Sequence, residues 1–162
     1  MNTAQDTEQL EYFMRAALAL SRESVRNGGG PFGAVIVRHG AIIAAASNSV
    51  TYTNDPTAHA EINAIRQACR KLKTFELSGC SLFTSCEPCP MCLGAIYWAR
   101  LEVIYYGNSK DDAARIGFDD AFIYQQLTIQ HPKRSIPMIN LLPQEAAQAF
   151  LDWEQMEDKT EY

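Results

Sequence analysis

The segment from Ser85 to Arg100, SCEPCPMCLGAIYWAR, constrains this chain more than any other. Cys89 and Cys92 stand three positions apart, directly after Pro88, and an apolar run of helical length follows them. Residues i and i+3 lie on one face of a helix, so both sulfur atoms can reach one metal ion. A helix that begins near Pro90 places both cysteines at its first turn, where the helix dipole favours thiolate over thiol. The segment therefore predicts a zinc site.

A second helix start, upstream, offers the remaining groups. Asp55-Pro56-Thr57 precedes His59 and Glu61, and apolar residues with helical spacing follow them: Ile62, Ile65, Ala68, Cys69 and Leu72. We expect Asp55 or Thr57 to cap this helix, with Pro56 in its first turn. On a regular helix His59 and Glu61 point roughly 200° apart, so they can share a site only off the helix end. The two helix starts are therefore expected to converge on one ion.

With His59, Cys89 and Cys92 as ligands, the fourth corner of a zinc tetrahedron stays open for water, as in catalytic rather than structural zinc sites. Glu61 would then take the proton of that water. The order H-x-E followed by P-C-x-x-C is the signature of the zinc-dependent nucleobase deaminases. The sequence thus predicts an enzyme that uses Zn²⁺ as its cofactor.

A closed, structural zinc site is the main alternative for this segment. Cys86 also forms a C-x-x-C pair with Cys89, and sites with three cysteines and one histidine are common. Against this reading, Cys86 ends an expected strand, and Pro88 separates it from the helical pair of cysteines. Cys69 and Cys80 occupy apolar positions and are expected to be core thiols.

The charge and the terminal sequence exclude several classes of partner. The chain has 162 residues, enough for one domain over 1–162, and a formal net charge of −5, which disfavours a nucleic-acid partner. Its start, MNTAQDTEQL, resembles no signal peptide, and no apolar run reaches membrane-spanning length. Three of the five cysteines crowd into residues 86–92, which suits metal binding in a reducing compartment. We expect a cytoplasmic protein with no membrane partner.

The pattern of apolar residues predicts a chain of alternating helices and strands, an α/β fold. Amphipathic helices are expected over residues 7–26 and 144–157, with a short polar helix over 108–118 and a loop over 117–122. Five strands are expected, at residues 34–37, 41–46, 80–85, 101–106 and 136–142. Strand, helix and strand from Cys80 to Tyr106 predict a parallel pair. Gly28, Gly30 and Gly33 match G-x-G-x-x-G, but they follow a helix and precede a strand, the reverse of a dinucleotide fingerprint.

With these motifs placed, the sequence resembles the cytidine deaminase-like zinc hydrolases and, within them, the short bacterial guanine deaminases. The shared segments are GGPFGAVIV (29–37), NDPTAHAE (54–61), TSCEPCPMCLGAIYWAR (84–100), GFDD (117–120) and the terminal Glu161-Tyr162. The resemblance implies a three-layer α/β/α fold with a mixed five-stranded sheet. It also implies hydrolysis of guanine to xanthine and ammonia, with zinc on His59, Cys89 and Cys92.

The resemblance further implies a proton shuttle, Glu61, and contacts to the purine from six residues: Phe32, Asn48, Ala60, Trp98, Asp120 and Tyr162. Phe32 would stack on the base, Asn48 would hydrogen-bond it and Trp98 would line the pocket. Asp120 would contact the 2-amino edge and help to move protons. Tyr162 would come from the partner subunit of a homodimer, because residues 143–162 form a closing helix and a C-terminal tail that is exchanged in this family.

Two other functions remain open at this stage. A tRNA adenosine deaminase or a free cytosine deaminase would share the zinc core, although the acidic charge argues against a tRNA substrate. A non-catalytic domain stabilised by zinc would explain the overlapping cysteine pairs without any reaction.

Overall fold

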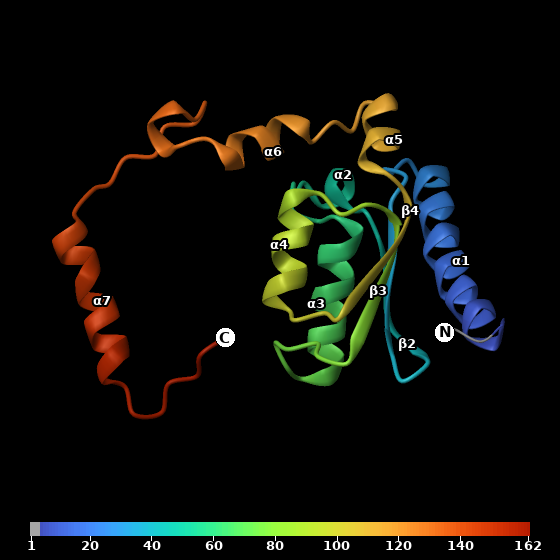
Figure 1. The fold of residues 1–162 in the computed structure, drawn as a ribbon, viewed down its shortest axis with the longest axis horizontal. Helices are drawn as coiled ribbons and strands as arrows, with labels where there is room; N and C mark the ends of the chain where they lie inside the picture. The colour runs from blue at the N-terminus through green and yellow to red at the C-terminus, as the bar shows by residue number, and fades with distance from the viewer. Residues whose placement is uncertain (1–3) are drawn as a thin grey trace. The chain divides into compact units, whose positions relative to one another are not determined.

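The computed structural model describes residues 4–162, which divide between Asp120 and Ala121 into two compact units. The first unit contains, in chain order, α1 (Ala4–Arg26), β1 (Gly33–Arg38), β2 (Ala41–Ser47), α2 (Val50–Thr53), α3 (Ala60–Leu72), β3 (Cys80–Cys86), α4 (Pro90–Trp98), β4 (Val103–Asn108) and α5 (Lys110–Arg115) (Figure 1). Neither α1 nor any other helix in residues 4–162 is long and apolar enough to cross a membrane.

The strands of the first unit form one mixed sheet with the order β2-β1-β3-β4. β1 pairs antiparallel with both β2 and β3, and β3 pairs parallel with β4. β2, β3 and β4 therefore run in the same direction. The predicted parallel pair around α4 is confirmed, and so is the mixed character of the sheet.

Helices cover both faces of this sheet, α1 on one and α3 with α4 on the other (Figure 1). Successive residues of a strand point to opposite faces, and β1 serves both layers in this way. Val35 packs with Phe13 of α1. Ile36 packs on the other face, in a cluster with Ala64 of α3 and Ile96 of α4. The predicted three-layer α/β/α architecture is confirmed.

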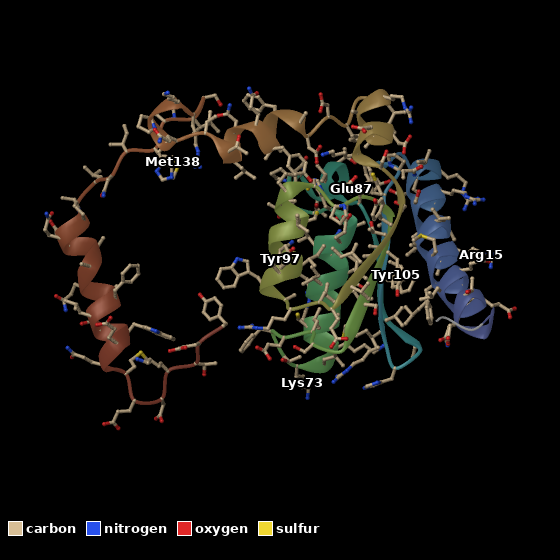
Figure 2. The ribbon with its side chains drawn as sticks, viewed as in Figure 1. Arg15, Lys73, Glu87, Tyr97, Tyr105 and Met138 are labelled. Atoms are coloured by element: carbon tan, nitrogen blue, oxygen red, sulfur yellow. The ribbon has the colours of Figure 1, made fainter. Side chains whose placement is uncertain are left out.

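Aromatic rings fill the layer under α1. The ring of Phe83 on β3 stacks on that of Tyr105 on β4, with centroids 4.6 Å apart, and contacts Phe13 at 5.3 Å. Figure 2 shows Tyr105 on the side of the sheet that α1 covers, whereas Tyr97 lies on α4. The layer beneath α3 consists mainly of small side chains, which lets that helix lie close to the sheet.

The prediction of a five-stranded sheet is wrong, because the described residues form four strands. The second unit contains α6 (Ala121–Thr128), a 3-10 turn η1 (His131–Lys133) and α7 (Pro143–Gln155). Residues 136–142, predicted as the fifth strand, have no strand structure. Pro137 offers no N–H to a sheet, and Leu142 has a left-handed φ of 53°, incompatible with an extended chain. The predicted helix over 144–157 is confirmed as α7, but α6 begins inside the segment predicted as a loop.

One glycine fixes the distance between α1 and the sheet. A Cβ on Gly33 would lie 2.4 Å from the carbonyl oxygen of Ala17 and 2.6 Å from the amide nitrogen of Ser21, both backbone atoms of α1. Real Cβ atoms do not approach backbone so closely, so α1 can cross the start of β1 only above a glycine. The third glycine of the G-x-G-x-x-G pattern thus has a packing role.

This close crossing predicts opposite effects for two Gly→Ala changes. Gly33→Ala should lower the free energy of unfolding by about 1–3 kcal/mol, as overpacking does. Gly94→Ala, the control, places a methyl group in open space on α4 and should raise it by about 0.5–1 kcal/mol. Urea denaturation of the two zinc-replete variants measures both values, and equal stabilities would contradict the close crossing.

Candidate metal centre and active site

Two helices begin at the same edge of the sheet. β2 and β3 run in the same direction, so their carboxyl ends lie together, and α3 and α4 each follow one of these ends. The N–H group of Ser49, just after β2, donates to the carbonyl oxygen of Ala58, just before α3, at 3.0 Å. Three residues connect β3 to α4. The positive ends of two helix dipoles therefore face one region.

One ligand sits just outside the start of each helix. His59 is the N-cap of α3 (φ −67°, ψ 156°), and Cys89 is the N-cap of α4 (φ −65°, ψ 168°). The predicted cap of α3 was therefore placed too early. The carboxylate of Asp55 instead accepts hydrogen bonds within the preceding turn, from the N–H (2.8 Å) and the hydroxyl (2.7 Å) of Thr57. His59 lies just off the helix end, and Glu61 lies in the first turn of α3.

The three predicted ligands meet with the separations of a tetrahedral zinc site. Nδ1 of His59 lies 3.6 Å from Sγ of Cys89 and 3.5 Å from Sγ of Cys92, and all three atoms lie within 4.8 Å of one another. Zinc bonds of about 2.3 Å to sulfur and 2.0–2.1 Å to nitrogen, at the tetrahedral angle, place nitrogen and sulfur about 3.6 Å apart. The donor set and its two nitrogen–sulfur distances fit zinc.

The electrostatics of these three groups favour a cation. A hydrogen bond from the Cys92 thiol lowers the pKa of Cys89 to about 4, although burial acts in the opposite direction. The same hydrogen bond, with burial, raises the pKa of Cys92. The hydrogen bond to Cys89 raises the pKa of His59. Cys89 is thus held as a thiolate that attracts positive charge, and a divalent metal takes the place of the protons that these groups share.

Glu61 stands beside the ligands with its carboxyl group buried. The residue is 5% exposed, and its Oε1 accepts a hydrogen bond from the Thr84 hydroxyl at 3.0 Å. Its Oε2 lies 3.5 Å from Sγ of Cys92. Burial is the main cause that raises the pKa of Glu61. A carboxyl group in this position can hold and release a proton next to the metal.

Cys86 stays out of the ligand group. Its thiol donates to the carbonyl oxygen of Ser109 at 3.7 Å, and burial raises its pKa to about 11. It lies at the end of β3, as predicted. Cys80 is buried in the core and Cys69 packs against that core, which confirms the prediction for both. Among the described residues, His59, Cys89 and Cys92 are therefore the three that are grouped as metal ligands.

Several predicted substrate contacts lie in the first unit. The N–H of Asn48, a residue 7% exposed, donates to the carbonyl oxygen of Phe32 at 3.1 Å, so the two residues are neighbours. The ring of Phe118 meets that of Phe32 edge to face, 4.9 Å between centroids. Burial and then the charge of Cys89 raise the pKa of Asp120. The GFDD segment thus lies against the Phe32 loop, and Phe118 is a contact that the sequence did not reveal.

Of the other predicted contacts, Ala60 and Trp98 also belong to the first unit. Ala60 is the fully buried first residue of α3, beside His59. Trp98 ends α4 and is 66% exposed, about 13 Å along the helix axis from Cys89 by the rise of an α-helix. Tyr162 belongs to the second unit. The substrate contacts of all six residues stay predictions.

Comparison with known proteins identifies this arrangement. Residues 7–108 match the family described as the cytidine and deoxycytidylate deaminase zinc-binding region. Guanine deaminase of Bacillus subtilis is 51% identical over 153 residues, which are 94% of this chain and 98% of that protein. The crystal structure of guanine deaminase from Bacillus subtilis superposes with a TM-score of 0.91 over the same shares of the two chains.

Two further relatives match a smaller part. A structure of guanine deaminase from Nitrosomonas europaea has a TM-score of 0.64 at 38% identity and covers 67% of this chain and 63% of that one. The tRNA-specific adenosine deaminase of Aquifex aeolicus is 46% identical over 96 residues, 59% of this chain and 64% of that protein. The match to the Bacillus protein covers so much of the chain that it includes most of the second unit.

A pair of buried thiols tests the ligand set. Cys92→Ser should abolish stoichiometric zinc binding, because it removes one of three ligands. Cys86→Ser, the matched control, should keep one zinc per chain, since Cys86 bonds to Ser109. Elemental analysis of the purified variants measures zinc content, and loss of zinc in Cys86→Ser would instead support the closed site.

Proposed function

Because the chain belongs to the cytidine and deoxycytidylate deaminase family of zinc-binding enzymes, we propose that it hydrolyses guanine to xanthine and ammonia. The observation that carries this proposal is the near full-length similarity to Bacillus subtilis guanine deaminase. The zinc core is common to deaminases of different substrates, so the core alone favours no base. The similarity outside the zinc core favours guanine as the substrate.

The alternatives explain less of the chain. The match to a tRNA-specific adenosine deaminase leaves out about two fifths of the residues, and a net charge of −5 is unfavourable for binding tRNA. A free cytosine deaminase would leave the GFDD segment without a role. A non-catalytic zinc domain would have no use for the open ligand position or for the buried Glu61.

The metal would be held by His59, Cys89 and Cys92. Zinc bound there supplies a Lewis acid that brings the pKa of a water molecule down to about 7. The protein's part would be to bind guanine with C2 beside the metal ligands and to move two protons. Phe32 would stack on the purine, and the amide of Asn48 would hydrogen-bond its edge.

Glu61 carries out the first proton transfer. Water adds its oxygen to C2 of guanine, and Glu61 takes a proton from that water and delivers it to N3. The remaining hydroxyl proton then passes through Glu61 or Asp120 to the 2-amino group. The C2–N bond breaks, ammonia leaves and the C2 carbonyl of xanthine forms. The raised pKa values of both carboxyl groups suit residues that must hold a proton in each cycle.

The exchanged dimer is part of the same proposal. In a unit as short as residues 121–162, large apolar side chains stay exposed: Ile136, Met138, Ile139, Leu141 and Phe150. A segment of this length seldom builds a core of its own, and such exposed surface is typical of a subunit interface. A homodimer that exchanges residues 143–162 would bring in Tyr162, and its interface would bury these side chains. All five cysteines are free thiols, which suits the cytoplasm.

One assay separates the candidate functions. The zinc-replete protein is incubated with guanine, adenine, cytosine and tRNA, and ammonia release is measured for each. Xanthine formation from guanine, with no turnover of the others, supports the proposal. Turnover only of cytosine or tRNA would replace it with a different deaminase, and tightly held zinc without any turnover would favour a binding domain.

The role of Glu61 predicts a variant that binds metal but does not react. Glu61→Gln should keep its zinc, because Glu61 is not a ligand, and should lose at least about 10²-fold in kcat, as removal of a general acid–base does. Glu8→Gln, which changes an exposed acid on α1, serves as the control and should react normally. Steady-state kinetics with guanine and a zinc assay check both points. A fully active Glu61→Gln enzyme would remove the proton shuttle.

A further inference from the structure

Thr84 occupies a position where a buried apolar residue would be expected. It lies on β3, where its backbone pairs with Ala34 of β1 on one side and Tyr106 of β4 on the other (Figure 1). The residue is fully buried. Its side chain faces the α3 layer, since its hydroxyl reaches Glu61. A hydroxyl buried in a central strand requires a partner, and here the partner is the carboxyl group of Glu61.

This hydrogen bond determines the orientation of the carboxyl group. The Thr84 hydroxyl donates to Oε1 of Glu61 at 3.0 Å, and Oε2 then lies 3.5 Å from Sγ of Cys92. Glu has three rotatable bonds, and its terminal torsion is only weakly restricted by its own sterics. A donor fixed in a strand that is paired on both sides supplies the missing restriction.

We infer that Thr84 is a positioning residue: its hydroxyl holds Oε1 of Glu61 so that Oε2 faces the metal ligands. The inference rests on the proposed function, since it concerns the proton that Glu61 moves. Thr84 touches neither the substrate nor the metal, and it acts through Glu61. Groups that orient residues around a metal site change activity by about 10–100-fold when they are removed.

The choice of variants separates positioning from packing. Thr84→Val keeps the shape of the side chain and removes the donor, so a packing role predicts little change. Thr84→Ser keeps the donor and removes a methyl group. Thr74→Val is the matched control: the Thr74 hydroxyl accepts a hydrogen bond from the N–H of Glu76, and Thr74 lies just past the opposite end of α3.

The experiment measures zinc content, kcat and KM for guanine in the four proteins, wild type included. Thr84→Val should bind one zinc per chain, lose about 10–100-fold in kcat and keep KM within about threefold, because the substrate contacts are intact. Thr84→Ser should recover kcat to within about threefold of wild type, and Thr74→Val should match wild type. If Thr84→Val does not fold, Thr84→Ala is measured in its place and is expected to show the same loss in kcat.

The outcomes distinguish this inference from the proposed function. A wild-type protein without turnover of guanine would overturn the proposed function and the inference together. An active wild type with full kcat in zinc-replete Thr84→Val or Thr84→Ala would overturn the inference alone. A loss confined to KM, or a loss that Thr84→Ser does not recover, would also overturn it, because packing would then explain the effect.

Discussion

The site depends on two helix N-termini that meet at one edge of the sheet. β2 and β3 run in the same direction, so the helices that follow them begin side by side, with His59 and Cys89 as their N-cap residues. An N-cap residue has an extended backbone, so its side chain is directed off the helix. The histidine and the two sulfurs thereby reach one point, and the dipoles of both helices favour the thiolate that a metal needs.

The burial of Glu61 is the second feature on which the site depends. A carboxylate removed from water is destabilised in its charged form, so the pKa of Glu61 rises, and burial is the largest cause. The hydrogen bond from Thr84 opposes this rise, and a cation beside the carboxylate would oppose it further. The fold therefore provides a carboxyl group whose protonation state depends on what occupies the metal centre. That property suits a residue that must accept one proton and release it within the same catalytic cycle.

The sequence predicts the ligands well because local patterns determine them. The H-x-E and P-C-x-x-C spacings, with a proline at the helix start, are sufficient to place His59 and both cysteines. The start of α3 was predicted too early because the Asp55 side chain bonds to its own turn, an alternative that competes with capping. Thr84 and Phe118 could not be predicted, since their partners lie 23 and 86 positions away. The apolar run at 136–142 is typical of a strand, but Pro137 has no N–H group to donate to a neighbouring strand.

We expect a zinc ion held by one nitrogen and two sulfur atoms of the protein, with a fourth position open to water. X-ray absorption at the zinc edge of the purified protein measures the number and type of ligands directly. The expected result is two sulfur atoms at about 2.3 Å and two nitrogen or oxygen atoms at about 2.0–2.1 Å. A third sulfur in the first coordination shell, or protein purified without zinc that binds none when it is supplied, would contradict it.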